Sequence, residues 1–481
     1  MSREAADTSL TRRDVLGRGA AAAASAAASP LLAASEGSGD HPNVLFISVD
    51  DLRPQLNCYG REQMVTPHLD RLAGRGLVFD RAYCQAPVCA ASRCSLLSGC
   101  RPDTTGIHSY HGRISEAMPQ VLTMPQHFRN HGYATASLGK VYHHLDDDPE
   151  GWTKKPWKPS NYFPGYVTER AKRLNEEGDR RGPAYEAAEV PDEAYADGRT
   201  ARRAVKELER LAGERFFLGV GFVRPHLPFN APQRYWDLYG PEDIVMPDYT
   251  RKPEGAPDAA MHNWGELRQY HGIPRQGDMS DDLARTLIHG YYSAVSYMDA
   301  QVGLLLDALQ RLGLAQNTVV IVWGDHGWNL REHGLWCKHS CFETSLRSAM
   351  LMAGPGVPRG RTTRKLTEFT DIYPSLADLC GLPVPDHLQG VSFVPLLQDL
   401  ERPWRRGAFS EFNNATTVRT HRYRYTRWVN DQGDQYAHML YDHHEDPRET
   451  VNLADRQSHR DVVQKLNTML NNRATSGMPP A

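Results

Sequence analysis

The sequence predicts an α/β layered fold with a large mixed, mostly parallel central sheet flanked by helices. Strand-length apolar runs alternate with helical segments over most of the chain, which is typical of such sheets. Several runs end abruptly in polar residues, as strands of a parallel sheet do at the edge that carries a functional site. After about residue 400 short strands and a closing helix predict a smaller C-terminal α+β subdomain with an antiparallel sheet.

Six apolar runs of strand length are predicted to form the central sheet. Each is nearly continuous in apolar residues, as strands covered by helices on both faces are. Asn43 to Val49 ends in Asp50-Asp51, and Thr318 to Trp323 ends in Gly324-Asp325-His326-Gly327. The other four runs are Leu77 to Tyr83, Tyr133 to Leu138, Phe216 to Phe222 and Met350 to Ala353.

Helices are predicted from their starting residues and from apolar residues at helical spacing. Thr66 stands as an N-cap residue before Pro67 at the first helical position. Asp281 to Leu312 has helical periodicity and ends at Gly313. A helix is also expected to begin at Ser95, behind Cys89. The remaining predicted helices are Met124 to Asn130, Arg199 to Leu211, Thr370 to Leu379 and Asp461 to Leu470.

Two stretches interrupt the alternation of strands and helices. Residues 146–191 and 241–278 are rich in Pro, Gly and charge, which predicts long surface insertions. We therefore expect residues 1–39 to be a signal and linker, residues 40–400 the main domain and residues 401–481 the smaller subdomain. Strands of this subdomain are predicted at Phe409 to Asn413, Tyr423 to Trp428 and Met439 to Asp442.

The composition is that of a folded globular protein. Of 481 residues, 40% are hydrophobic and 23% charged, and the net charge of −3 offers no basic excess for nucleic acid. Eight cysteines in a chain of this length do not make a disulfide scaffold, and spacing leaves open whether Cys337 and Cys341 pair. The body of the chain has no run of eighteen or more strongly apolar residues, so no transmembrane helix is predicted there.

The N-terminal segment predicts export from the cytoplasm. Arg12-Arg13 precedes an alanine-rich stretch, Ala20 to Ala28, and a further small-residue segment that ends at Ser35. A twin arginine before a weakly apolar stretch resembles a twin-arginine signal, which implies a periplasmic or extracellular protein. The alternative is a disordered, low-complexity tail.

The segment Pro87 to Gly99 carries the candidate reactive group. Cys89 is followed by Ala90, Ala91 and Ser92, and Arg93 provides a cation four residues later. The thiol is either a plain buried cysteine or a nucleophile, or a nucleophile precursor, beside a fixed positive charge. The segment alone favours the plain cysteine, and the clusters elsewhere in the chain change that balance.

Polar clusters follow the predicted strands and fall into two chemical sets. Three carboxylates and one imidazole suit a hard divalent cation such as calcium, although a pair of aspartates at a strand end is more often a turn or a helix cap. The cations and remaining imidazoles suit a tetrahedral oxyanion ester, although most loop lysines and arginines are only solvated charges. The first set is Asp50, Asp51, Asp325 and His326, and the second is Arg93, Lys140, His143, His226 and Lys338.

These motifs, in this order, resemble the type I sulfatase family, and within it the iduronate-2-sulfatase branch. The resemblance runs from about residue 42 to the C-terminus. It implies an alkaline-phosphatase-like fold and a sulfuric ester hydrolase. The matching segments are Asn43 to Gly60, Cys89 to Gly99, Arg101 to Thr105, Gly139 to His143, Pro225 to Phe229, Asp325 to Trp328, Glu332 to Gly334 and Trp336 to Lys338.

The resemblance also implies the reactive group and one bound metal ion. Cys89 would be converted by a formylglycine-generating or equivalent maturation enzyme to formylglycine, whose hydrate supplies the attacking hydroxyl. The family pattern has proline where this chain has Ala91. Arg93 matches the arginine that steadies the hydrate. The implied Ca²⁺ ligands are Asp50, Asp51, Cys89, Asp325 and His326.

The remaining site residues take their roles from the same resemblance. Lys140 and Lys338 would bind sulfate oxygens, and His226 would protonate the departing alcohol. His143 would take a proton from the second hydroxyl of the hydrate, so that sulfate leaves and the aldehyde is regenerated. His143 is preferred over His144 because its spacing from Lys140 matches the iduronate branch.

The predicted function is therefore hydrolysis of a sulfate ester on a sugar, in a sulfated glycan or oligosaccharide, with release of inorganic sulfate. A phosphatase or phosphodiesterase of the same fold is one alternative, in which Cys89 could act directly as nucleophile. A non-catalytic sulfated-glycan-binding relative is the other. The insertions 146–191 and 241–278 are expected to shape the substrate pocket.

Overall fold

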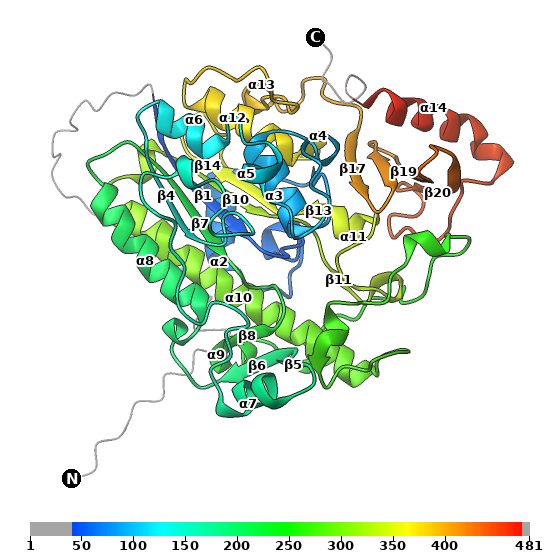
Figure 1. Cartoon of the computed structure of the whole chain (residues 1–481), viewed down its shortest axis with the longest axis horizontal. Helices are drawn as coiled ribbons and strands as arrows, with labels where there is room; N and C mark the ends of the chain where they lie inside the picture. The colour runs from blue at the N-terminus through cyan, green and yellow to red at the C-terminus, as the bar shows by residue number, and fades with distance from the viewer. Residues whose placement is uncertain (1–40, 474–481) are drawn as a thin grey trace.

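The computed structural model describes residues 41–473, so the predicted signal lies outside the described residues. A seven-stranded sheet forms the centre of the main domain (Figure 1). Its mixed, mostly parallel character confirms the predicted fold class. The strand order is β15 (Arg361–Thr363), β2 (Leu77–Phe79), β14 (Met350–Ala353), β10 (Thr318–Gly324), β1 (Asn43–Val49), β7 (Phe216–Phe222) and β4 (Ala134–Gly139).

Four neighbouring parallel strands explain why polar residues from distant parts of the chain meet. β1 lies between β10 and β7 and is parallel to both, with Val49 in register with Gly324 on one side and Phe222 on the other. β4 continues the parallel arrangement beside β7. The residues that follow these strands therefore leave the sheet at one common edge.

Helices cover both faces of the sheet, as Figure 1 shows. The 31-residue helix α10 packs against α8 and α2 on one face, and the buried helix α3 lies with α6 and α12 on the other. The bounds are α2 (Pro67–Arg75), α3 (Cys89–Ser98), α6 (Met124–Asn130), α8 (Ala196–Leu211), α10 (Asp281–Arg311) and α12 (Ile372–Leu379).

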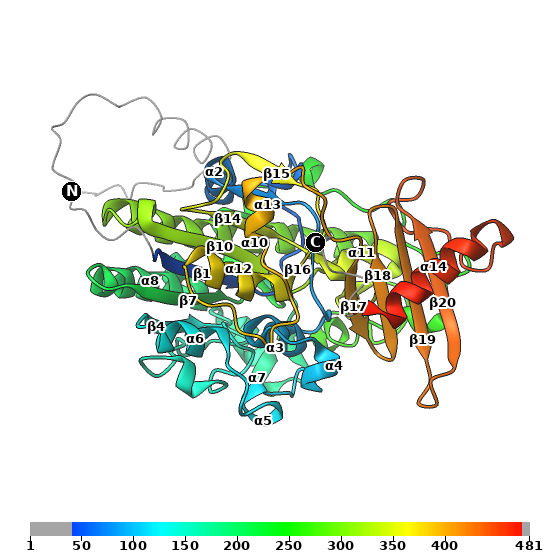
Figure 2. The ribbon, with the colours of Figure 1, turned by 90° about the horizontal axis from the view of Figure 1, so that it is seen from above.

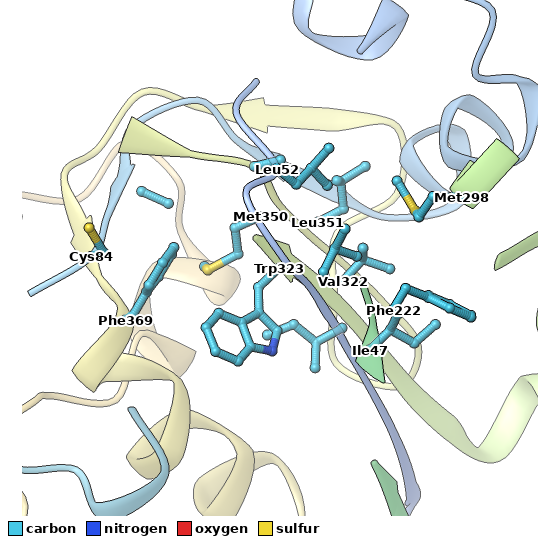
Figure 3. Close-up of a cluster of buried hydrophobic side chains, with 14 of the residues drawn as sticks. Ile47, Leu52, Cys84, Phe222, Met298, Val322, Trp323, Met350, Leu351 and Phe369 are labelled. Atoms are coloured by element: carbon cyan, nitrogen blue, oxygen red, sulfur yellow. The ribbon is translucent and has the colours of Figure 1, made fainter. Parts of the chain in front are cut away.

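A continuous apolar core holds the strand ends in place (Figure 3). Trp323 on β10 is fully buried and lies 5.4 Å from the Phe369 ring and 5.5 Å from the Phe46 ring. Met350 and Leu351 pack beside it from β14. Close packing of large side chains around β10 keeps rigid the strand that delivers Asp325 and His326.

Three sequence-based predictions are wrong in their details. Leu77 to Tyr83 is two strands in different sheets, β2 and β3 (Ala82–Tyr83), because Asp80 and Arg81 turn the chain between them. Thr66 and Pro67 occupy the predicted N-cap and first helical positions of α2, but the Thr66 hydroxyl makes no capping hydrogen bond, since it accepts from the Asn57 amide and donates to Asp70. The helix expected at Ser95 begins six residues earlier, at Cys89.

The insertion 146–191 holds more regular structure than its composition predicts. It contains α7 (Glu169–Glu177), β5 (Arg181–Pro183) and β6 (Tyr185–Ala188). β6 pairs with β8 (Phe229–Pro232), and β5 pairs with β9 (Tyr270–His271) of the second insertion. The pairing of β5 with β9 therefore joins the two insertions. α9 (Gln233–Trp236) follows β8.

A four-stranded antiparallel sheet and the final helix lie at one end of the molecule (Figure 2). The strands are β17 (Ala408–Phe412), β18 (Ala415–Arg419), β19 (Tyr423–Val429) and β20 (Gln435–Asp442), and the helix is α14 (Arg460–Asn471). Sequence reasoning missed β18. An ion pair joins this sheet to the main domain, since Arg424 on β19 pairs with Glu343, and Arg424 also pairs with Glu449 within the smaller subdomain.

The remaining elements are short. All cysteines among residues 41–473 are free, which answers the open question about Cys337 and Cys341. None of the helices in this range is long and apolar enough to cross a bilayer. The short elements are β3, α4 (Pro102–Thr105), α5 (Ile114–Ala117), β11 (Asn329–Leu330), β12 (Trp336–Cys337), α11 (Glu343–Leu346), β13 (Arg347–Ser348), β16 (Thr367–Glu368) and α13 (Val394–Gln398).

Candidate active site

Carboxylates from β1 and β10 meet at the common edge of the sheet. Asp50 and Asp51 follow β1 directly, and Asp325 and His326 follow the neighbouring strand β10. The Asp325 backbone amide donates to Val49, and the Asp51 amide donates to the Asp325 carboxylate at 3.0 Å. Asp51 adopts φ of +58°, which turns the chain out of the strand. All four side chains are fully buried.

Cys89 lies opposite this edge as the first residue of α3. Its Sγ is 3.3 Å from His326 Nε2. Ala90, Ala91 and Ser92 continue the helix at once, and every residue of α3 is buried. Because all sides of α3 are covered, the amphipathic pattern that marks a helix start in a sequence is missing here. The thiol is therefore held at a helix N-terminus and faces the acidic cluster.

The predicted metal ligands form two overlapping groups. Ligand atoms of Asp50, Cys89, Asp325 and His326 all lie within 4.8 Å of one another. Asp51 belongs to a second such group with Cys89 and His226, and its Oδ1 is 3.5 Å from His326 Nε2. Several buried carboxylate oxygens around one point are the donors that Ca²⁺ prefers, so the residues present fit this ion.

Arg93 is fully buried beneath the acidic cluster. Its Nε donates to Asp325 at 2.8 Å, and one terminal nitrogen lies 3.4 Å from Asp50. The other terminal nitrogen donates to the Val141 carbonyl at 2.9 Å. Arg93 thus fixes the two carboxylates relative to the loop that carries the predicted sulfate-binding lysine.

The two predicted sulfate-binding lysines pair with the first two carboxylates. The Lys140 ammonium contacts Asp50, and Lys338 Nζ lies 3.1 Å from Asp51. Lys338 also lies over the Trp328 ring, 5.1 Å from its centroid. Both lysines are almost completely buried, so each cation faces the site instead of bulk water.

These contacts set the protonation states of the site. Burial disfavours ionised Asp50, but the charges of Lys140, His226 and Arg93 outweigh burial and hold the pKa of this carboxyl well below its usual range. Burial, and then the charge of Asp50, raise the pKa of the Cys89 thiol well above its usual range. The thiol is therefore protonated and is a poor nucleophile as it stands.

His226 lies on the loop after β7 and faces three carboxylates. Its Nδ1 is 2.6 Å from the Leu227 carbonyl, so Nδ1 carries the proton and Nε2 faces the site. Burial opposes protonation, but Asp51, Asp50 and Glu266 outweigh it and raise the pKa of His226 above its usual value. His226 is therefore suited to hold a second proton at Nε2 and to donate it.

Glu266 is a site residue that sequence reasoning missed. Its carboxylate bridges His226 Nε2 at 3.0 Å and Lys338 Nζ at 2.9 Å. It stands just before a short 3-10 turn in the insertion 241–278, where no strand end marks it. Burial opposes its ionisation, yet Lys338 and His226 hold the pKa of Glu266 well below its usual range.

His143, and not His144, faces the buried charges. Burial, and then the charge of Lys140, lower the pKa of His143 to about 2, so its ring is neutral. Its Nδ1 is buried without a hydrogen-bond partner among residues 41–473. His144 Nε2 instead contacts the Tyr110 carbonyl near the surface. The structure thus brings all the predicted site residues to one edge of the sheet.

Comparison with known proteins adds the family. The sulfatase family model matches residues 42–382, and a model of the C-terminal part of N-sulphoglucosamine sulphohydrolase matches residues 331–476. Iduronate 2-sulfatase of Mus musculus is 31% identical over 515 aligned residues, covering 89% of this chain and 93% of the mouse protein.

Two solved structures share the fold at lower sequence identity. One, solved in complex with its substrate D-glucosamine-2-N,6-O-disulfate, is 21% identical with a TM-score of 0.71 and covers 91% of this chain and 98% of its own. The other is the phosphonate monoester hydrolase of Agrobacterium radiobacter, 22% identical with a TM-score of 0.74, covering 90% of this chain and 96% of its own.

Proposed function

The chain belongs to the sulfatase family and is a sulfuric ester hydrolase, and we propose that it desulfates a sugar with a formylglycine made from Cys89 and one Ca²⁺. The observation that carries this proposal is the position of Cys89. Its Sγ lies at the start of α3, inside a ring of buried carboxylates, cations and imidazoles. Such a ring suits an ester that carries negative charge on three oxygens.

The state of Cys89 supports its conversion. A thiol whose pKa is raised by burial and by Asp50 gives little thiolate, so direct attack by sulfur is disfavoured. Conversion to formylglycine by a maturation enzyme would place a hydrated aldehyde, with its attacking hydroxyl, at this position. Ala91 stands where the family pattern has proline. It is fully buried inside α3 and has no polar side-chain group.

The metal would be held by Asp50, Asp51, Asp325, His326 and the residue made from Cys89. Bound there, Ca²⁺ would supply a Lewis acid that lowers the pKa of the attacking hydroxyl. Burial raises the pKa of Asp51, and the nearby Lys338 does not fully offset this effect. A further positive charge, such as that of Ca²⁺, would stabilise the ionised carboxylate. Asp50 and Asp51 would then bind Ca²⁺ in addition to their contacts with Lys140 and Lys338.

Lys140 and Lys338 would then bind the sulfate group. Both ammonium groups remain charged, because Asp50 for Lys140 and Asp51 for Lys338 outweigh the effect of burial and raise the pKa of each lysine. They approach the site from different segments, after β4 and after β12. Two fixed cations on different sides would orient the sulfur for attack and stabilise the charge on the oxygens.

His226 and His143 would move the protons. Nε2 of His226 is the proton donor that faces the site, so it would protonate the departing sugar oxygen. Glu266 would hold this imidazole in place between turnovers. Neutral His143, whose Nδ1 has no hydrogen-bond partner in the described part of the chain, would accept the proton released when the aldehyde is regenerated. Donor and acceptor thus belong to different loops.

The sugar class follows from the relatives. The mouse relative is an iduronate 2-sulfatase, and one structural neighbour was solved with a glucosamine disulfate. We therefore propose a sulfated glycan or oligosaccharide as substrate, with the joined insertions shaping its pocket. Such glycans occur outside cells, which agrees with the proposed twin-arginine export to the periplasm or the medium.

The alternatives have less support. The phosphonate hydrolase shares the fold at 22% identity, which carries no argument for its chemistry. A glycan-binding relative without catalysis would be expected to have lost a ligand or a cation, and none of the predicted site residues is missing from the cluster.

Mass spectrometry and sulfate release test the proposal together. The peptide that contains Cys89, from enzyme coexpressed with a formylglycine-generating enzyme, should carry the aldehyde, and Cys89→Ala should lose sulfate release by roughly 10⁴-fold or more. Cys380→Ala, at a buried cysteine directly after the C-terminal end of α12, is the matched control and should keep activity. An unmodified thiol in fully active enzyme would falsify the mechanism.

A further inference from the structure

A second, arginine-rich pocket lies where the two insertions meet. Its volume is about 410 Å³, within the roughly 300–1,000 Å³ of ligand-binding pockets. Its lining residues lie in and next to the paired strands β5 and β9, and β5 lies below the central sheet in Figure 1. We call it the arginine pocket, and its lining residues are Asp179, Arg180, Arg181, Arg268, Gln269 and Arg275.

Most of the positive charge in the arginine pocket is not neutralised by acidic side chains. Arg268 donates from all three nitrogens to backbone carbonyls, those of Asn263, Pro274 and Gly277, at 2.7 to 2.8 Å. Arg180 likewise donates to the Tyr270 and Ile273 carbonyls. Neutral acceptors hold a guanidinium in place and leave its charge available to an anion.

Arg181 is held by aromatic rings and not by acids. Its guanidinium lies 5.8 Å from the Phe163 ring centroid and 5.6 Å from that of Tyr270. Within residues 41–473, none of Arg180, Arg181 and Arg268 forms an ion pair; of the four arginines in the lining, only Arg275 does, with Asp179. Asp278 acts electrostatically on Arg268 without forming an ion pair with it, so among the described residues the four arginines of the pocket face two carboxylates, those of Asp179 and Asp278, and the pocket keeps an excess of positive charge.

The arginine pocket adjoins the leaving-group side of the active site. Phe163, against which Arg181 packs, meets the ring of His226 edge-on at 5.7 Å, so one exposed aromatic ring separates the guanidinium from the proposed proton donor. Arg268 stands two residues after Glu266, which contacts His226 itself. A sugar whose sulfate lies in the active site would extend towards this pocket.

We propose that the arginine pocket is a second anion subsite, which binds a sulfate or carboxylate group on another unit of the same oligosaccharide. This inference rests on the proposed function and narrows its substrate class to polyanionic glycans. Planar guanidinium groups match both oxyanions with paired hydrogen bonds, and several unneutralised cations raise the local concentration of an anionic chain. The binding energy supplied there would position the reacting ester.

The kinetic test compares two substrates. One is 4-nitrophenyl sulfate, which cannot reach the arginine pocket, and the other is a heparin tetrasaccharide. We expect Arg181→Gln to lower the ratio of kcat/KM for the tetrasaccharide to that for the aryl ester by about tenfold, and Arg181→Glu to lower it further. Arg359→Gln, an exposed arginine between β14 and β15, should leave the ratio as in wild type. A ratio that stays constant across the Arg181 series overturns the inference.

A binding measurement separates this inference from the proposed function. Cys89→Ala protein is titrated calorimetrically with the tetrasaccharide, with its desulfated form and with its carboxyl-reduced form. Weaker binding of the tetrasaccharide after Arg181→Glu supports the subsite even if no ester is hydrolysed. Equal affinity with and without Arg181→Glu refutes it, whatever the activity. If the effect of Arg181→Glu persists with the carboxyl-reduced form, the pocket binds sulfate; if it disappears with that form, the pocket binds carboxylate. Raising salt should weaken that binding.

Discussion

In the active site Arg93 donates to the carboxylates of Asp50 and Asp325, whereas in the arginine pocket Arg268 donates only to backbone carbonyls. Both guanidinium groups are held by several hydrogen bonds. The first is fully buried and its charge is balanced, and the second is partly exposed and its charge is not. The same side chain thus serves to hold a site together in one place and to attract a ligand in the other.

The difference follows from burial. An unpaired charge in the interior carries a large desolvation cost, so the active-site cations need their carboxylates. At the surface water solvates the guanidinium, and neutral acceptors suffice to fix its direction. We therefore expect changes in the active site to alter both stability and catalysis, and changes in the arginine pocket to alter only substrate preference.

The largest effect is expected from Arg93→Gln. It leaves Asp50 and Asp325 buried with less compensation, so the free energy of unfolding should fall by about 3–5 kcal/mol with a chelator present. The loss should be smaller with Ca²⁺, which would compensate the same carboxylates, and sulfate release should be abolished in both conditions. Urea unfolding of wild type and variant in both conditions measures this. Equal losses with and without Ca²⁺ would count against a metal at these carboxylates.

Most of this fold could be predicted because local patterns carry it. The buried runs at β1, β7 and β14 match their predicted bounds, since helices cover both faces and the runs read as continuous apolar segments. β18 was not predicted from the sequence. It pairs with β17 across a two-residue turn, Asn413-Asn414, with φ of +47° and +62°. Two asparagines in succession favour such a hairpin turn and were the available signal.

The site residues likewise fall into those that the sequence predicts and those that it does not. Residues at strand ends, such as Asp50 and Asp325, are visible in the sequence because the end of an apolar run marks them. Glu266 has no such marker, since it lies in a loop and reaches His226 only through the tertiary fold. The arginine pocket likewise depends on the pairing of β5 with β9, between segments about ninety positions apart. Sequence periodicity carries no information on such a contact.

The second-largest effect is expected from a change of the proposed proton donor, His226, in the active site. His226→Gln should lower kcat on a sulfated sugar by roughly 10²–10⁴-fold. The loss should be much smaller on 4-nitrophenyl sulfate, because nitrophenolate leaves without a proton. His144→Gln, which removes an imidazole near the surface, is the matched control. Equal losses on both substrates would mean that His226 does not protonate the leaving group.

A smaller effect is expected from Glu266→Gln, at the border between the two sites. A raised pKa keeps His226 protonated to higher pH, so activity is lost as pH rises through that pKa. Removing the Glu266 charge removes one of the causes that raise the pKa of His226, so it should move this alkaline limb to lower pH. The pH profile of kcat, with exposed Glu242→Gln as control, measures the shift. A lower plateau with an unmoved limb would show that Glu266 acts only by positioning Lys338.

The smallest effect, and one of opposite sign, is expected from Asp179→Asn. Asp179 is the single carboxylate in the lining of the arginine pocket, and its removal frees the charge of Arg275. Both side chains are about 70% exposed, so water and salt screen their interaction. The preference for the tetrasaccharide over the aryl ester should therefore rise by only about twofold. A fall in that ratio would mean that Asp179 itself contacts the glycan, since loss of a negative charge next to an anion cannot weaken binding electrostatically.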